Sequence, residues 1–83
     1  MRVLLFASAR EAAGNRSVLR ISLPPGSTLG DLLAGLRRDY PGMDRILRTA
    51  RVARNGEYVP PRGEASPLDP SDEIAILPPY SGG

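Results

Sequence analysis

Three residue types that carry much of the chemistry of proteins are missing from this 83-residue chain: cysteine, histidine and lysine. Without cysteine there is no disulfide framework, no thiolate metal site and no catalytic thiol. Without histidine the chain lacks the commonest general base and the commonest metal ligand, so we expect no metal site. All eleven basic residues are arginine, so no lysine side-chain amine is offered as an acceptor for isopeptide bonds. These absences argue against an enzyme that works alone.

Long apolar runs are also missing. No run approaches the roughly 18 residues that a membrane-spanning helix needs, and no basic-then-apolar leader opens the chain. We therefore expect a cytoplasmic protein that does not enter a membrane. The chain is 41% hydrophobic and 24% charged, which is typical of one globular domain. A domain of this size has a small core, so a deep active-site cleft is not expected.

Apolar alternation and turn residues predict the strands. Strands are expected over residues 2–7, 17–23, 52–53, 57–59 and 73–77. A turn over 11–15 makes the first two strands a hairpin, and Asn55-Gly56 is a strong signal for a second hairpin. Residues 60–70 contain four prolines and are expected to form a loop.

Helical spacing occurs twice. Thr28 and Asp31 form an approximate capping box at the start of the main helix, inside which Gly35 costs about 1 kcal/mol relative to alanine. Its apolar stripe consists of Leu29, Leu32, Leu33 and Leu36. A second, short helix is indicated by Met43, Ile46, Leu47 and Ala50. The predicted fold class is α+β: a mixed sheet of about five strands, with the first and last strands central and adjacent, and one main helix packed across it.

The six residues after Leu77 are the feature with chemistry in them. Pro78 and Pro79 donate no ladder hydrogen bond and favour an extended backbone, so the sheet ends there. Gly82 and Gly83 have no side chains, and the six residues reach roughly 20 Å. Such an end can pass through a narrow channel and present its carboxylate to a reactive group of another protein. The alternative is an ordinary frayed terminus.

This ending resembles that of the small subunit of molybdopterin synthase, the MoaD family. That family typically ends in an acidic pair, an apolar strand, Pro-Pro, two variable residues and Gly-Gly, which here occupy 72–83 within the similar segment 67–83. Residues 5–14 resemble the family's opening strand and Arg-Glu-x-x-Gly turn, and 55–59 resemble its middle hairpin. Arg54 departs from the pattern, because an apolar residue usually precedes the asparagine.

The resemblance implies a ubiquitin-like β-grasp domain over 1–77 and an extended tail over 78–83, acting together as a sulfur carrier. A partner related to ubiquitin-activating enzymes would adenylate Gly83 with ATP, and sulfur would then replace one carboxylate oxygen. The tail that threads into the large subunit would comprise Pro78, Pro79, Tyr80, Ser81 and Gly82. The carrier would have no catalytic residue and no bound cofactor of its own, and the family assembles two small with two large subunits. A separate enzyme would donate the sulfur.

Three apolar residues are expected to form a docking surface for these partners beside the root of the tail. Phe6, Tyr58 and Leu77 each lie on the strand face opposite an evident core residue. The resemblance assigns the same positions to contact with the large subunit. The alternative is a second small cluster under the 60–70 loop.

Other charged residues are interpreted as structural. Residues 37–54 carry a local charge of +4 but offer only one aromatic residue, so a solvated helix face is favoured over nucleic-acid binding. Arg10 and Glu11 are expected to order a turn, and the carboxylates of Asp69, Asp72 and Glu73 to be solvated acids in a turn.

Other functions share the sequence features. A carrier for thiazole or cysteine synthesis has the same fold and ending. A protein modifier would join targets through Gly83, and a plain interaction module would make no use of the glycines. The Pro-Pro ending and the opening motif favour the pterin pathway.

Overall fold

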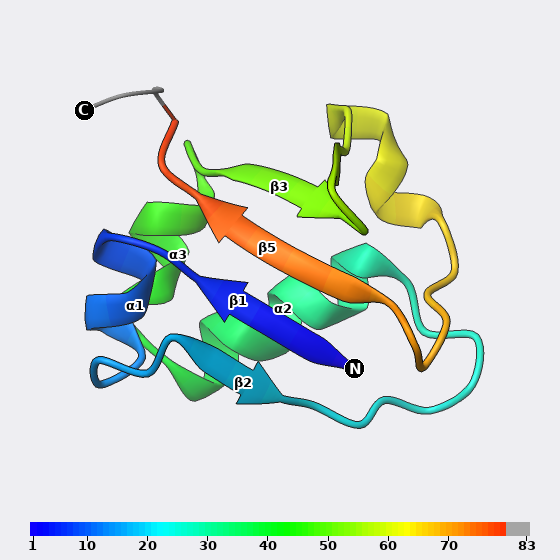
Figure 1. The fold of residues 1–83 in the computed structure, drawn as a ribbon, viewed down its shortest axis with the longest axis horizontal. Helices are drawn as coiled ribbons and strands as arrows, with labels where there is room; N and C mark the ends of the chain where they lie inside the picture. The colour runs from blue at the N-terminus through cyan, green and yellow to red at the C-terminus, as the bar shows by residue number, and fades with distance from the viewer. Residues whose placement is uncertain (80–83) are drawn as a thin grey trace.

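A computed structural model describes residues 1–79, apart from the side chains of Pro61 and Arg62. The elements in chain order are β1 (Arg2–Leu5), α1 (Ser8–Ala12), β2 (Val18–Arg20), α2 (Leu29–Asp39), α3 (Met43–Leu47), β3 (Arg51–Arg54), β4 (Glu57–Tyr58), the 3₁₀ helix η1 (Pro61–Ala65) and β5 (Glu73–Leu77). The sheet order is β2-β1-β5-β3-β4, and β1 and β5 pair in parallel at its centre (Figure 1). The mixed five-stranded sheet with one main helix confirms the predicted α+β class.

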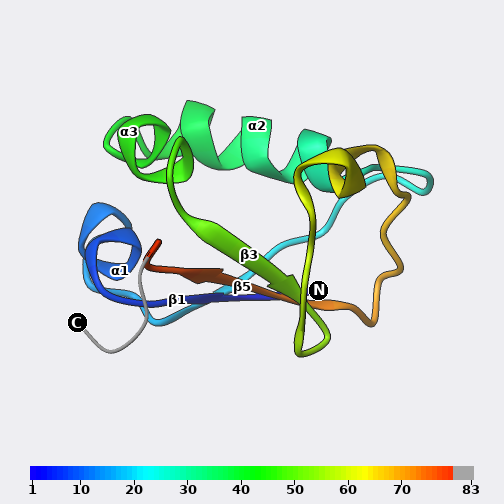
Figure 2. The same ribbon diagram turned by 90° about the horizontal axis from the view of Figure 1, so that it is seen from above.

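Helices cover one face of the sheet. Figure 2 shows α2 and α3 on one side of the strands, and no helix within residues 1–79 lies on the other side. Val3, Leu5, Ile74 and Ile76 point from the two central strands to the covered face and are at most 2% exposed. The leucine stripe of α2 packs onto them: Leu29, Leu32, Leu33 and Leu36 are all buried. The stripe predicted from the sequence is therefore the helical half of the core.

The start of α2 is fixed by a complete capping box, as predicted. The Asp31 N–H donates to Thr28 Oγ1 at 3.2 Å, and the Thr28 N–H donates to Asp31 Oδ2 at 2.9 Å. Both bonds give an acceptor to a backbone N–H group that has none within the helix. The short helix α3 is also confirmed. No helix among residues 1–79 combines the length and apolarity needed to cross a membrane.

Two short helices were not predicted. Helix α1 occupies part of the expected turn over 11–15, because the small residues Ala9 and Ala13 are buried against the core four positions apart. The turn itself follows, where Gly14 and Asn15 have positive φ of 71° and 66°. Helix η1 lies in the expected loop, with proline at its first position, where the missing N–H is harmless. One helical turn is too short to show a periodic pattern in the sequence.

Candidate functional site

The root of the tail lies at the centre of one end of the sheet. Strand β5 ends at Leu77, between the end of β1 and the start of β3 (Figure 1). Pro78 and Pro79 follow, and neither has an N–H with which to extend the ladder. The remaining tail residues singled out by the sequence lie outside the described residues: Tyr80, Ser81, Gly82 and Gly83. The parallel pairing of β1 with β5 puts the N-terminus at the opposite end of the sheet.

Phe6 and Leu77 are neighbours on the open face of the sheet. In the parallel pairing Leu5 lies beside Ile76, and the Phe6 N–H donates to the Ile76 carbonyl at 3.3 Å. Phe6 is 44% exposed and Leu77 is half-buried, whereas Leu5 and Ile76 are at most 2% exposed. The alternation assumed in the sequence analysis is therefore present at both positions.

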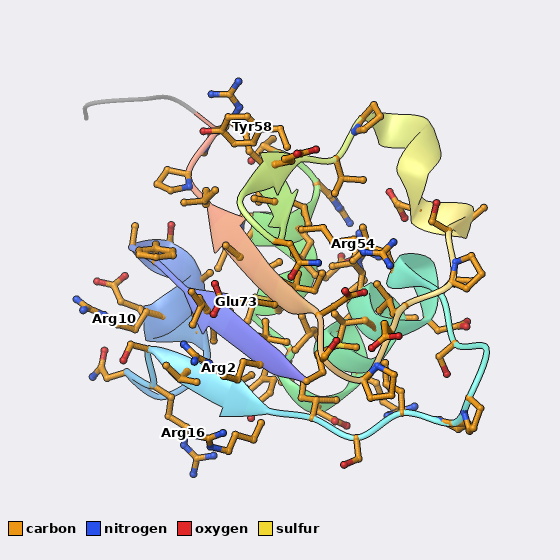
Figure 3. All side chains as sticks on the ribbon, turned by 45° about the vertical axis from the view of Figure 1, so that its right-hand side comes forward. Arg2, Arg10, Arg16, Arg54, Tyr58 and Glu73 are labelled. Atoms are coloured by element: carbon orange, nitrogen blue, oxygen red, sulfur yellow. The ribbon has the colours of Figure 1, made fainter. Side chains whose placement is uncertain are left out.

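Tyr58 reaches the same surface through Arg51. Leu77 pairs with Arg51 across β5 and β3, and the Arg51 guanidinium lies 4.4 Å from the centre of the Tyr58 ring. A guanidinium over a tyrosine ring is a favourable cation–π contact. Tyr58 is 60% exposed, and Figure 3 shows it on the outermost strand. We call Phe6, Leu77, Arg51 and Tyr58 the open-face patch.

The sequence favours a solvated helix face for Arg51 and does not indicate its contact with Tyr58. The structure corrects this: Arg37, Arg38 and Arg48 are paired with aspartates on or next to the helices, but Arg51 and Arg54 lie on strand β3. A usable signal existed. The two-residue Asn55-Gly56 turn places Tyr58 opposite Ala53, so Arg51 is its diagonal neighbour on the same face.

The 60–70 loop does not cover the patch. The Leu29 N–H donates to the Ser66 carbonyl at 3.3 Å, and Thr28 forms an isolated bridge with Pro67. The loop therefore crosses the start of α2 on the covered side of the sheet. This placement leaves the side chains of Phe6 and Tyr58 open to solvent, as a docking surface requires. Docking at the patch itself stays a prediction.

A hollow of about 950 Å³ opens beside the tail root. Helix α1 forms one wall, the region of α3 forms another, and Leu77 to Pro79 form the third. Its lining includes both apolar and charged side chains, such as Ile46 and Arg45. Phe6 and Leu77 of the open-face patch also line the hollow, so the hollow and the patch adjoin each other at the tail root.

At the other end of β5 the structure corrects the interpretation of the acidic residues. Asp72 is only 6% exposed and is the buried acid of a small network. Arg54 Nη2 lies 2.7 Å from Asp72 Oδ2, and Asn55 Nδ2 donates to Asp72 Oδ1 at 2.8 Å. The hydrogen bond from the Asp69 backbone N–H, opposed by burial and supported by Asn55 and Arg54, lowers the pKa of Asp72.

The network also accounts for Arg54. In the sequence this arginine departs from the family pattern, which leaves the register of the hairpin open. In the structure the register is regular, with Arg54 opposite Glu57, and Asn55 and Gly56 have the positive φ of a two-residue turn. Arg54 follows the covered side of β3 to reach Asp72 and the Pro67 carbonyl. The polar residue is tolerated because a carboxylate and a carbonyl satisfy it.

The other two acids remain near solvent. Hydrogen bonds from the Ser71 backbone N–H and hydroxyl lower the pKa of Asp69. Glu73 pairs with Arg2 at 3.1 Å on the open face, where Figure 3 shows the two side chains pointing toward each other. These contacts order the segment that leads into β5, and they do not indicate a catalytic or ligand-binding role.

Comparisons with known proteins agree over the whole length of the chain. A family model described as the ThiS family matches residues 3–83. The molybdopterin synthase sulfur carrier subunit of Chlamydomonas reinhardtii is 40% identical over 83 residues, which are 100% of this chain and 98% of that protein. Small archaeal modifier protein 1 of Haloferax volcanii is 36% identical over 87 residues, covering 95% of each.

Solved structures give the same fold. The solution structure of small archaeal modifier protein 1 from Methanosarcina acetivorans matches with a TM-score of 0.80 and 33% identity, over 99% of this chain and 94% of that one. A chain from the complex of subunits 1 and 2 of the molybdopterin-converting factor of Helicobacter pylori matches with a TM-score of 0.71 over 99% of this chain and 96% of that one. At 22% identity this second likeness concerns the fold alone. The predicted ubiquitin-like β-grasp fold is confirmed.

Proposed function

Because the chain belongs to the ThiS family, we propose that it is the small, sulfur-carrying subunit of a molybdopterin synthase. It carries sulfur as a thiocarboxylate at Gly83 and delivers it for dithiolene formation in molybdopterin. One observation carries this proposal. The chain is similar along its full length to sulfur carrier subunits, and its Gly-Gly ending is included in that match.

The chemistry requires help from outside the chain. A carboxylate is a poor electrophile, and the chain contains no histidine or cysteine to activate it. In the proposed reaction the Gly83 carboxylate attacks the α-phosphorus of ATP in a partner adenylyltransferase, and pyrophosphate leaves. A sulfur nucleophile at the oxidation level of sulfide then attacks the carbonyl carbon and expels AMP. ATP is thus a substrate of the partner, and the carrier needs no cofactor of its own.

The fold supports this role by separating a rigid base from a thin tail. Strand β5 is held on both sides by β1 and β3, so its end is a fixed origin for the tail. The open-face patch lies at that origin and offers apolar and cationic contacts to a docking protein. A partner bound at the patch therefore receives the tail at a defined place. The terminal glycines have no side chains that could obstruct the passage of the tail.

The proposed partners follow from these steps. They are the large subunit that contains the catalytic residues, in an assembly of two small and two large subunits, the adenylyltransferase related to ubiquitin-activating enzymes, and a sulfur-donor enzyme. The carrier alone is not a catalyst in this scheme. Neither a nucleic acid nor a membrane takes part, and the compartment is cytoplasmic.

The test is the intact mass of the protein purified gently from its own cells. We expect a species heavier by the difference between sulfur and oxygen, which disappears when Gly83 is deleted. The large subunit should co-purify with the unmodified chain. An unchanged mass after incubation with ATP, a sulfur donor and the adenylyltransferase would contradict the proposal.

A protein modifier is the second candidate, because the Haloferax volcanii relative is named a modifier protein. As a modifier, the activated Gly83 carbonyl would be attacked by a lysine amine of a target, with AMP or a thiol as the leaving group. This chain contains no lysine. Polymers in which one copy is joined through Gly83 to a lysine side chain of another copy are therefore excluded. Isopeptide-linked conjugates found by mass spectrometry in its own cells, in the absence of thiocarboxylate, would favour this candidate. A carrier for thiazole or cysteine synthesis would instead co-purify with the enzymes of those routes.

A further inference from the structure

The outer edge of β2 is an unpaired strand edge next to a groove. Strand β2 lies at the end of the sheet and, among residues 1–79, pairs only with β1. The Leu5 N–H donates to the Ser17 carbonyl at 2.9 Å and the Ile21 N–H donates to the Met1 carbonyl at 3.0 Å, so odd-numbered residues direct their backbone groups to β1. In an antiparallel pair the alternate residues direct theirs outward. Val18 and Arg20 thus present free N–H and C=O groups to an added strand.

The groove lies between this edge and helix α2. It has a volume of about 390 Å³ and a lining of both polar and apolar side chains. Its apolar floor is formed by the half-buried side chains of Ile21, Leu23 and Tyr40. Beneath them lie Leu19, Leu32 and Leu36, which are at most 6% exposed. Side chains that alternate along an added strand would point into this floor at every second position.

Gly35 is the wall of the groove on the helix side, and the fold does not require it. A Cβ built at this position meets only Arg38 Nη2 at 3.6 Å, an ordinary contact. Alanine would therefore fit, and it would stabilise the helix by about 1 kcal/mol. Since the packing of the protein does not require glycine at this position, we infer that the glycine serves a bound partner. Its missing side chain widens the groove beside the free edge.

The rim of the groove is basic. Arg16, Arg20 and Arg38 line it, and the single acid, Asp39, is paired with Arg38 at 3.2 Å. Figure 3 shows Arg16 extending away from the sheet at the start of β2. A segment bound here gains from negative charge at its ends.

We propose that the β2 edge and the groove beside it bind an extended segment of a partner protein, with alternating apolar residues flanked by acidic ones. The segment adds a sixth strand, and its apolar side chains enter the groove over Gly35. A second copy of this chain is a poorer occupant, because it would place the arginines of both β2 strands along one seam. The other edge is unsuited, since β4 has two residues and is soon followed by Pro60 and Pro61.

The site is independent of the proposed sulfur chemistry. The open-face patch lies at the end of β1 and across β5, β3 and β4, so a segment on the outer edge of β2 does not cover it. A protein held at β2 could keep the carrier bound while its tail is loaded or emptied elsewhere. Failure of the binding test described next would leave the intact-mass test unaffected.

The experiment is a titration of the ¹⁵N-labelled full chain with the capped peptide Glu-Glu-Ile-Thr-Val-Ile-Glu-Glu, followed by NMR. We expect amide shifts at Val18, Arg20 and Gly35 and slower hydrogen exchange at the first two. The control peptide has proline at the positions that would donate hydrogen bonds to β2, and it should not bind. Shifts centred on Phe6 and Leu77, or none at all, would overturn the proposal. So would concentration-dependent protection of the β2 amides without peptide, which would identify a second copy as the occupant.

Variants locate the determinants. Gly35→Leu should weaken binding at least about tenfold by filling the groove, and Gly35→Ala should weaken it less while raising thermal stability. Arg20→Glu should weaken binding about fivefold, and more at low salt, whereas the matched charge change Arg45→Glu on α3 should not. Unchanged binding in Gly35→Leu, with native circular dichroism, would rule out the groove.

Discussion

Strand β5 carries two rows of side chains that face opposite sides of the sheet. On the covered side, Ile74 and Ile76, together with Asp72 just before the strand, are at most 6% exposed. On the open side, Glu73, Ala75 and Leu77 are all half-buried. The two rows have similar proportions of apolar residues, so composition alone does not separate them.

The difference between the rows comes from the helices. Because α2 and α3 lie on one side only, the residues facing them form the core, and the other row stays available to a partner. The contrast continues in the neighbouring strands, where Leu5 is buried and Phe6 is exposed. One face of the strand thus stabilises the fold, and the other is proposed to bind partners. Substitutions along the strand can test this difference.

The largest effect is expected from Ile76→Asp. This side chain is 0% exposed, and an unpaired carboxylate at such a position costs about 4 kcal/mol or more, comparable to the whole stability of a small domain. We expect loss of the native circular dichroism spectrum. The conservative control Ile76→Val should cost about 1 kcal/mol in urea unfolding. A folded Ile76→Asp protein would show that the covered row is not the core.

The change at the neighbouring position, Leu77→Asp, should impair binding and leave the fold intact. We expect the fold to survive and the affinity for the large subunit to fall about a hundredfold, because an apolar contact at the centre of the proposed interface is lost. Calorimetric titration with the large subunit measures this, and Glu73→Gln on the same face is the control. An unfolded Leu77→Asp protein would instead place Leu77 in the core.

Asp72→Asn sharpens the comparison at the polar end of the covered row. Loss of the charge facing Arg54 should cost about 1–2 kcal/mol in the free energy of unfolding. The pKa of Asp72 is lower in the folded state, so its contribution is complete above the unfolded pKa and is lost as pH falls through the folded one. The wild type should therefore lose stability relative to the variant below about pH 4.

The control for this pH dependence is Asp39→Asn. Asp39 is exposed and pairs only with its neighbour Arg38 among the described residues. Unfolding curves at several pH values should run parallel to those of the wild type. If Asp72→Asn also runs parallel, the buried network does not stabilise the fold through its charge.

The smallest effect on stability is expected from Tyr58→Ser on the open face. The change removes the contact with Arg51, which is worth about 0.5 kcal/mol at an exposed site. Binding to the large subunit should nevertheless weaken about fivefold, because an exposed aromatic anchor is lost. Thermal melting and calorimetric titration measure the two quantities separately. A large fall in melting temperature without loss of binding would assign Tyr58 to the core.

Much of the fold was predictable because its signals are local. The four leucines of α2, the capping pair Thr28 and Asp31, and the Asn55-Gly56 turn each lie within a few residues of chain. The same holds for the carrier ending, whose glycines directly follow β5. Helix α1 was missed because one helical turn with two buried alanines gives no repeated pattern.

Long-range neighbours were not predictable in the same way. The sequence does not state that Arg51 bridges Leu77 and Tyr58, or that Arg54 and Asp72 meet in a buried pair. Each of these contacts depends on β5 entering the sheet between β1 and β3, which brings together residues from both ends of the chain. Only Arg51 could have been placed by extending the register of the hairpin.

The sequence by itself determined the five strands, α2 and α3, the apolar stripe and the glycine tail, because propensity, capping and turn chemistry act over a few residues. The tertiary structure alone decided which acid is buried and which strand edge is left unpaired. Burial and strand order depend on where every other element packs. In this protein the packing of the helices and the order of the strands create the surfaces on which its proposed partners would bind.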